Sequence, residues 1–363
     1  MKRTSLHKIT IVALLFLVVN VNYSCISAQE TPLQYIAQAT IGKITVDGKS
    51  DEASWKKAAW SDYYIDIEGK KTPKYTTRMK MVWDKDNLYF YVEMEEPHVW
   101  ATLKQRDTVI FYNNDFEIFI DPDGDTHNYY EYEMNAHNTL WDLFLTKPYR
   151  NKGKVLDSWD IQGVQSAVSI QGTLNDASDV DSGWAVEIAI PWNVITEASS
   201  STSAPVNDFW RINFSRVNWD FDLTNGRYSR RKDKKTGKFA SEYNWVWSPQ
   251  GVINMHEPEK WGYVYFAPEK VGEKSSFQLP KEEHIKWYLY DLYKELRGEP
   301  YTDALHKDYK KIVKAKKYVL GKLMAPELDI HASGWNIKVK NPFSNKTLLI
   351  KEDGKFRTYE TKE

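Results

Sequence analysis

The residues best suited to chemistry lie in two runs of alternating polarity. Glu117 lies in the run 116–120, in which every second residue is apolar, and Asn135 ends a similar run that carries Glu131 and Glu133 on the face of Asn135. Because side chains alternate across a strand, Glu117 and Asn135 are expected to share one polar face. A carboxylate accepts hydrogen bonds and an amide both donates and accepts, so this pair suits a ligand rich in hydroxyl groups. A solvated sheet face without a ligand is the alternative.

A second group of polar residues follows directly. Asp121, Asp123 and Asp125 alternate around Gly124. This spacing gathers oxygen ligands for a hard cation such as calcium, although it is not an EF-hand, because the glycine is misplaced and no glutamate follows at the required position. A turn between strands is often rich in Asp and Gly in any case. The three aspartates are therefore the candidate metal ligands, and structural calcium is the candidate cofactor.

Aromatic residues are unusually frequent, with 15 Trp and 23 Tyr. Their flat apolar faces and polar tips suit the packing of sugar rings, although most of them are expected to fill a core. The candidates for a binding platform are Trp100, Tyr112, Trp141, Trp219 and Trp247. Trp100 follows Pro97 in a predicted loop, so we expect its side chain to be exposed.

Two arginines are candidate sugar ligands as well. Arg106 lies in a loop predicted beside the polar face, and Arg216 lies in a predicted strand. A guanidinium can stack on a ring and donate paired hydrogen bonds to neighbouring hydroxyls. Either arginine could instead pair with a carboxylate.

The elements that position these residues are mostly strands. From 41 to 268 short strand patterns alternate with turn signals, which predicts an all-β, antiparallel β-sandwich of jelly-roll type. After 270 the pattern changes to helices at 282–296 and 303–323 and a hairpin at 335–350, a small C-terminal α+β extension. The predicted division is a signal peptide at 1–28, a carbohydrate-binding sandwich at 29–270 and the extension at 271–363.

Residues 1–28 have the pattern of an export signal. Basic residues precede an apolar run at 9–21, and small residues follow it. Cleavage after Ala28 predicts a secreted or periplasmic protein, whereas lipidation of Cys25, the single cysteine, would anchor it at the cell surface. No later apolar run is long enough for a transmembrane span.

The charge balance bears on the partner. Removal of residues 1–28 takes away three basic and no acidic residues, which leaves 46 basic against 50 acidic side chains. A nucleic-acid partner usually requires a basic surface. We therefore expect no nucleic acid among the partners.

Five motifs in order resemble the family 9 carbohydrate-binding modules. They are Ile-Thr-Val-Asp-Gly at 44–48, Val-Trp-Asp at 82–84, Asn-Asp-Phe-Glu-Ile-Phe-Ile-Asp-Pro at 114–122, Gly-Trp-Ala-Val-Glu-Ile-Ala-Ile-Pro-Trp at 183–192 and Pro-Glu-Lys-Trp-Gly at 258–262. The resemblance covers about 41 to 268. It implies a β-sandwich that binds glucan or xylan chains, holds structural calcium, and is usually attached to glycoside hydrolases.

The resemblance also implies site residues. The matching Glu and Asn, which are Glu117 and Asn135 here, hydrogen-bond the sugar in the family. Two family tryptophans that clamp the sugar are missing, because their places are taken by the stretch 110–112 and by Met255 and His256. The platform must therefore be rebuilt from other residues, or the ligand differs.

The predicted function is non-catalytic binding of a polysaccharide or oligosaccharide by an exported protein, with a role in polysaccharide degradation and a glycoside hydrolase as candidate partner. The alternative is a glycoside hydrolase that uses Glu117 and a second carboxylate such as Glu133. A haem module is disfavoured, because the adjacent Met255 and His256 would point in opposite directions.

Overall fold

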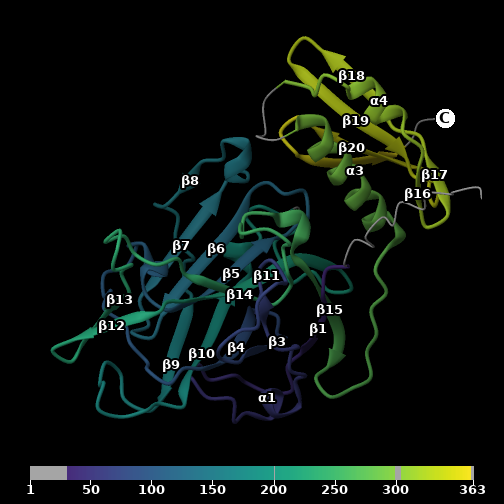
Figure 1. Ribbon diagram of the computed structural model, residues 1–363. Helices are drawn as coiled ribbons and strands as arrows, with labels where there is room; N and C mark the ends of the chain where they lie inside the picture. The colour runs from purple at the N-terminus through teal and green to yellow at the C-terminus, as the bar shows by residue number, and fades with distance from the viewer. Residues whose placement is uncertain (1–30, 200, 299–303, 361–363) are drawn as a thin grey trace, which may run out of the picture. The chain divides into compact units, whose positions relative to one another are not determined.

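The computed structural model describes residues 31–199, 201–298 and 304–360 (Figure 1). The predicted signal peptide and Cys25 lie outside the described residues. Within the described ranges, no helix has both the length and the apolar character needed to cross a membrane.

Most of the chain forms a β-sandwich, as predicted. Its strands are β1 (Gln34–Ala39), β2 (Ile65–Asp66), β3 (Thr77–Trp83), β4 (Asn87–Glu95), β5 (Asp115–Asp121), β6 (Tyr129–Asn135), β7 (Leu140–Leu145), β8 (Val155–Leu156), β9 (Gln165–Gln171), β10 (Gly183–Pro191), β11 (Phe209–Asn218), β14 (Tyr243–Val246) and β15 (Gly262–Lys270). A separate hairpin is formed by β12 (Phe221–Thr224) and β13 (Arg227–Arg230). The short helices are α1 (Ala53–Lys57), α2 (Trp192–Ile195), η1 (Ile110–Tyr112), η2 (Tyr149–Asn151) and η3 (Pro258–Lys260).

The hydrogen-bonded strand order is β8-β7-β6-β5-β11-β15-β1-β3-β4-β10-β9, with β14 added beside β11 and β2 beside β14. The two halves of this order face each other across the core, since the rings of Phe90 on β4 and Phe214 on β11 lie 5.7 Å apart. Strand β11 pairs with β15 through its first residues and with β14 through its last, so it links the two layers.

Strand β1 is the exception to the antiparallel pattern. It pairs in parallel with both β15 and β3. This strand is not predictable from the sequence, because the run 34–39 lacks turn signals and clear alternation. The pairing closes the middle of the sandwich, where the Trp83 indole donates hydrogen bonds to the carbonyls of Ala37 and Ala267.

The core is built from the inward faces of the strands. Phe116, Ile118 and Ile120 of β5 are buried in it, as alternation predicts. Trp184 and Trp261, which belong to two of the five motifs, are also buried. A second apolar cluster, which includes Phe119 and Trp261, lies on the opposite face of the β5–β6–β7 layer. The predicted polar face is therefore covered by side chains and loops rather than open to solvent.

The C-terminal part contains α3 (Lys281–Arg297), α4 (Tyr309–Lys314), the hairpin β16 (Lys317–Val319) and β17 (Lys322–Met324), and a sheet of β18 (Glu327–His331), β19 (Gly334–Lys340), β20 (Lys346–Lys351) and β21 (Phe356–Glu360). Ile285, Leu289, Leu292 and Leu296 are buried, in agreement with the helical spacing. They belong to an apolar cluster of their own, packed against this sheet.

The predicted helix at 303–323 is wrong over most of its length. Only α4 is helical, and the chain then turns back at Leu320 and Gly321 to pair β16 with β17. Both residues have a positive φ, which is incompatible with a continuing helix. Residue 303 lies outside the described residues.

Candidate functional site

The candidate site is a cavity of about 300 Å³ on the face of the β5–β6–β7 layer that points away from the main core. We call it the recess, and define it by the lining residues Phe111, Glu117, Glu131, Glu133, Trp141 and His256. Figure 1 shows β5, β6 and β7, which supply its floor, side by side.

The floor follows from strand register. Glu117 on β5 pairs with Glu133 on β6, and Glu133 pairs with Trp141 on β7. The next row holds Phe119 opposite Glu131. Because residues at every second position share a face, the alternation seen in the sequence brings these side chains together.

The walls come from loops and short helices. Phe111 belongs to η1 and Tyr149 to η2, and His256 lies in the loop before η3. The His256 ring packs edge-on against Tyr149 at 4.4 Å and against Phe119 at 5.7 Å. The positions at which the family resemblance expects two tryptophans, 110–112 and 255–256, thus both contribute to the recess, through Phe111 and through Met255 and His256.

The carboxyl groups of the floor lie in a poorly hydrated environment. Burial raises the pKa of Glu117 to about 7. Burial, followed by the neighbouring carboxylates, raises the pKa values of Glu131 and Glu133 well above the ordinary range. Glu133 also accepts a hydrogen bond from the backbone N–H of Phe111 at 3.0 Å. The floor can therefore present protonated carboxyl groups as donors and ionised groups as acceptors.

Of the predicted sugar ligands, Glu117 and Trp141 line the recess. Asn135 shares the face of Glu117, as predicted, but its amide is fully used. It donates to the carbonyl of Leu103 and to Asn113, and it accepts from the backbone N–H groups of His137 and Thr139. The predicted sugar contact of Asn135 is therefore corrected: it holds a turn.

The expected exposure of Trp100 is wrong. Its side chain is 2% exposed and stacks on Tyr228 at 6.2 Å, in a small apolar cluster that also contains Trp219. Trp219 is buried too, and its indole donates to the carbonyl of Phe111. Neither indole offers a free face, so the predicted platform roles of both are corrected to packing roles.

Tyr112 is the exposed member of the predicted platform. Its side chain is 44% exposed, its ring meets Phe111 edge-on, and the Arg230 guanidinium lies over it at 4.2 Å. It is not among the lining residues of the recess. Its predicted sugar contact stays a prediction.

Arg216 is buried, which corrects its predicted role. Its guanidinium donates to Glu96 at 2.6 Å, to the carbonyl of Glu95 and to the Thr77 hydroxyl. Its side chain therefore links β11 to the opposite layer and does not reach the recess.

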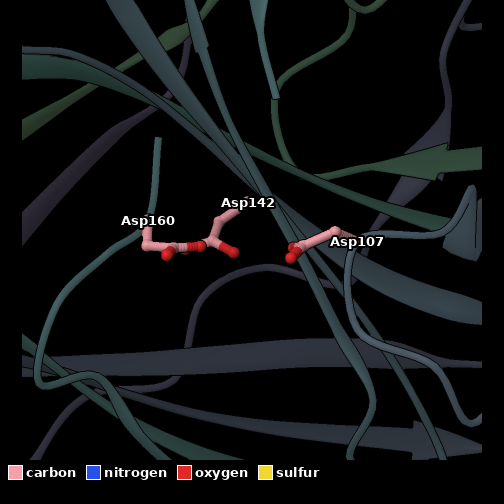
Figure 2. Close-up of side chains that lie close together, drawn as sticks. All are labelled: Asp107, Asp142 and Asp160. Carbon is pink, nitrogen blue, oxygen red and sulfur yellow. The ribbon is translucent and has the colours of Figure 1, made fainter. Parts of the chain in front are cut away.

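Arg106 lies within a separate acidic group. It donates to Asp142 at 2.5 Å and to Asp160 at 3.1 Å, and Asp107 lies 3.6 Å away. Figure 2 shows the carboxylates of Asp142 and Asp160 meeting, with Asp107 reaching toward them from the other side. These pairings occupy Arg106, and the structure does not bring it to the recess.

The predicted calcium ligands do converge. Carboxylate oxygens of Asp121, Asp123 and Asp125 lie within 4.8 Å of one another. Asp121 accepts from the backbone N–H groups of Gly124 and Thr126, and burial followed by the two neighbouring aspartates raises its pKa. Lys355 pairs with Asp125 at 2.9 Å. An all-oxygen donor set of this kind fits a hard cation.

Sequence reasoning missed two parts of the recess. Glu242 lines it from the loop before β14 and Tyr149 from the short helix η2, and no sequence pattern pointed to either. Glu131 and Glu133 were recognisable from the alternation of the run 129–135. Their burial was not, because it depends on the loops that cover the face.

The recess lies on one layer of a β-sandwich, has aromatic walls, and offers carboxyl groups that can bind hydroxyls. These features are typical of domains that bind small ligands or glycans. The model of the carbohydrate family 9 binding domain-like family matches residues 46–263. The chain belongs to this family. Membership places the sandwich among non-catalytic carbohydrate-binding domains, and the glycoside hydrolase alternative is not favoured.

Two curated relatives match over part of their length. The exoglucanase XynX of Acetivibrio thermocellus is 27% identical over 164 residues, which is 44% of this chain and 13% of the relative. The endo-1,4-beta-xylanase A of Thermoanaerobacterium saccharolyticum is 26% identical over 166 residues, 46% of this chain and 12% of the relative. The chain thus spans only a small part of either relative.

Solved structures with a similar fold include a family 9 carbohydrate-binding module from Caldicellulosiruptor kristjanssonii in complex with cellotriose. It is 15% identical, with a TM-score of 0.43, covering 68% of this chain and all of that one. A putative carbohydrate-binding protein from Bacteroides uniformis is 16% identical, with a TM-score of 0.47, covering 65% of this chain and all of that one.

Proposed function

We propose that this chain captures a polysaccharide or oligosaccharide in the recess and does not cleave it. The observation that carries the proposal is the floor row of Trp141, Glu133 and Glu117, which sets an aromatic face beside buried carboxyl groups. Sugar rings pack their C–H groups on aromatic faces while their hydroxyls require hydrogen-bond partners. The family assignment supports this reading, and glucan and xylan chains are the first ligands to try.

The test is a calorimetric titration of the purified chain with oligosaccharides of several linkages. Trp141→Ala should weaken binding of the best ligand about fivefold, because a stacked aromatic contact contributes on the order of 1 kcal/mol. Tyr318→Ala, which removes an aromatic side chain that is 66% exposed and lies outside the recess, is the matched control and should bind normally. Equal losses in both variants, or none in either, would place the ligand elsewhere.

The same preparations distinguish binding from catalysis. Incubation with the best ligand should release no new reducing ends, since the family is one of binding domains. Release that disappears in Glu117→Gln would instead establish the glycoside hydrolase.

The remaining features complete the proposal. Residues 1–28 direct export, and the bound polysaccharide is a substrate for a partner glycoside hydrolase. Calcium would be held by Asp121, Asp123 and Asp125, where it would fasten the turn after β5. Mass spectrometry of the protein recovered from its host would show whether the chain begins after Ala28 or at an acylated Cys25.

A further inference from the structure

The recess gathers an unusual number of carboxyl groups. Four carboxyl groups line it, those of Glu117, Glu131, Glu133 and Glu242. Among its described lining residues there is no lysine or arginine. Asp115 adds a fifth carboxyl group within 4.8 Å of the Glu117 and Glu133 oxygens. Buried carboxylates are normally paired with cations, so this arrangement calls for a partner that the chain does not supply.

One carboxyl oxygen points to that partner directly. Oε2 of Glu131 makes no hydrogen bond, although the side chain is only 5% exposed and lines the recess. Its neighbour is Nε2 of His256 at 4.0 Å. Burial, and then Arg150, lower the pKa of His256 to about 3, so the imidazole is neutral at physiological pH. His256 therefore does not supply the missing charge.

The groups that face these carboxyls come from several elements. They are Asp115 and Glu117 on β5, Glu131 and Glu133 on β6, Glu242 before β14, Tyr149 on η2 and His256 before η3. A hydroxyl group of a neutral sugar donates one hydrogen and brings no charge. An ammonium group donates three hydrogen bonds and also offsets a buried negative charge.

Resting on the proposed function, we propose that the recess is selective for amino sugars, with the ammonium group bound at Glu131 and Glu133 and the ring on Trp141. A metal ion alone would leave the aromatic walls without a function. Trp141, Tyr149 and Phe111 surround a cavity of about 300 Å³, which is at the small end of ligand pockets and suits a sugar unit. Aromatic faces near the ammonium add a favourable cation–π contact.

The test compares three oligosaccharides of the same length and linkage, in calorimetric titrations near pH 6. They are the glucosamine oligomer, the N-acetylglucosamine oligomer and the cello-oligosaccharide, which differ in the group at one ring carbon. We expect the glucosamine oligomer to bind at least tenfold more tightly than the other two. The double variant Glu131→Gln/Glu133→Gln should lose this preference, so that the glucosamine oligomer binds no more tightly than the two neutral oligomers. Its circular dichroism spectrum should match that of the wild type, which shows that it folds.

A polycation can bind any acidic surface, so a charge control is needed. Glu327→Gln removes one exposed carboxylate outside the recess and should keep the full preference. The proposal is overturned if the two neutral oligomers bind as tightly as the glucosamine oligomer, or if the preference survives in the double variant. Tight binding of calcium or zinc at the recess with no sugar preference overturns it also. Failure of all three oligomers in the wild type is a different result, which refutes the proposed function itself.

Discussion

Two groups of buried glutamates in this molecule are treated in opposite ways. Glu257 and Glu259 lie beside η3 with Arg150 and Lys294, and four ion pairs of 2.6–3.0 Å join them. Glu117, Glu131 and Glu133 in the recess have no such partner among the described residues that line it. The chain thus matches buried carboxylates with cations where they serve the fold, and leaves them unmatched where a ligand would enter.

The pKa values express the same difference. Burial alone would raise the pKa of Glu259, but Arg150 and Lys294 outweigh it and hold the pKa well below its usual range. In the recess burial acts without such opposition, and the pKa of Glu117 rises to about 7. The pKa of Glu257 is raised, because burial and the neighbouring Glu259 outweigh the two cations. At neutral pH Glu259 therefore stabilises the fold, whereas Glu117 in the recess costs stability.

The largest expected effect is on the paired group. Arg150→Met leaves two buried carboxylates with only one of their two shared cations, Lys294, and should lower the free energy of unfolding by about 3–5 kcal/mol. Urea denaturation followed by tryptophan fluorescence measures the loss. Arg231→Met is the control, because that guanidinium is half exposed and should contribute less than about 1 kcal/mol. If both variants lose less than about 1 kcal/mol in the free energy of unfolding, the ion pairs of Glu257 and Glu259 do not stabilise the fold as expected.

Glu117 in the recess should make the free energy of unfolding depend on pH in the direction opposite to that expected from Glu259. Because the folded-state pKa of Glu117 is raised, the folded protein binds more protons than the unfolded chain between about pH 4.5 and 7. The free energy of unfolding should therefore fall as the pH rises through this window. Glu117→Gln should reduce that fall and stabilise the protein at pH 8 by up to about 3 kcal/mol. Superimposable pH profiles for wild type and variant, from denaturation at each pH, would contradict the account.

The loop of Asp121, Asp123 and Asp125, the proposed calcium ligands, is intermediate, since Lys355 matches only part of its charge. Calcium at a hundredfold excess over its Kd should raise the free energy of unfolding by about 2.7 kcal/mol. Thermal unfolding with calcium and with a chelator measures this as a rise in Tm, and Asp123→Asn should abolish the response. An unchanged Tm in the wild type would mean that the three aspartates form a turn and bind no calcium.

The smallest effect should follow from giving the recess its own cation. Glu242 is half-buried beside Glu117, so Glu242→Lys should lower the pKa of Glu117 and stabilise the protein at pH 8 by about 0.5–1 kcal/mol. The same variant should bind the glucosamine oligomer less tightly. Measured on one preparation, the free energy of unfolding should rise while the affinity for the glucosamine oligomer falls. Tighter binding of the glucosamine oligomer would argue against charge as the basis of selectivity.

Much of the fold could be predicted from the sequence, because alternation and turn residues report directly on strands. The burial of Phe116, Ile118 and Ile120 followed from period alone. Strand β1 could not be predicted, because its parallel pairing depends on segments far away in the sequence.

The candidate site was only partly predictable. The alternation of side chains predicted that Glu117, Glu131 and Glu133 share one face. The exposure of individual side chains depends on the loops that cover them, and it was predicted wrongly. Trp100 was expected in the open and is packed on Tyr228. Asn135 was expected to meet a sugar, but its contacts with three backbone groups and with the Asn113 side chain use all of its hydrogen-bonding capacity.

The most direct test of the recess as a carbohydrate site is a crystal structure of the chain with a bound glucosamine oligomer. We predict a sugar ring against Trp141, with its ammonium nitrogen within hydrogen-bonding distance of Oε2 of Glu131. A sugar ring in the recess with its amino group turned to solvent would confirm the binding site but refute its selectivity for amino sugars. An oligomer bound elsewhere, with the recess filled only by water, would contradict the central claim.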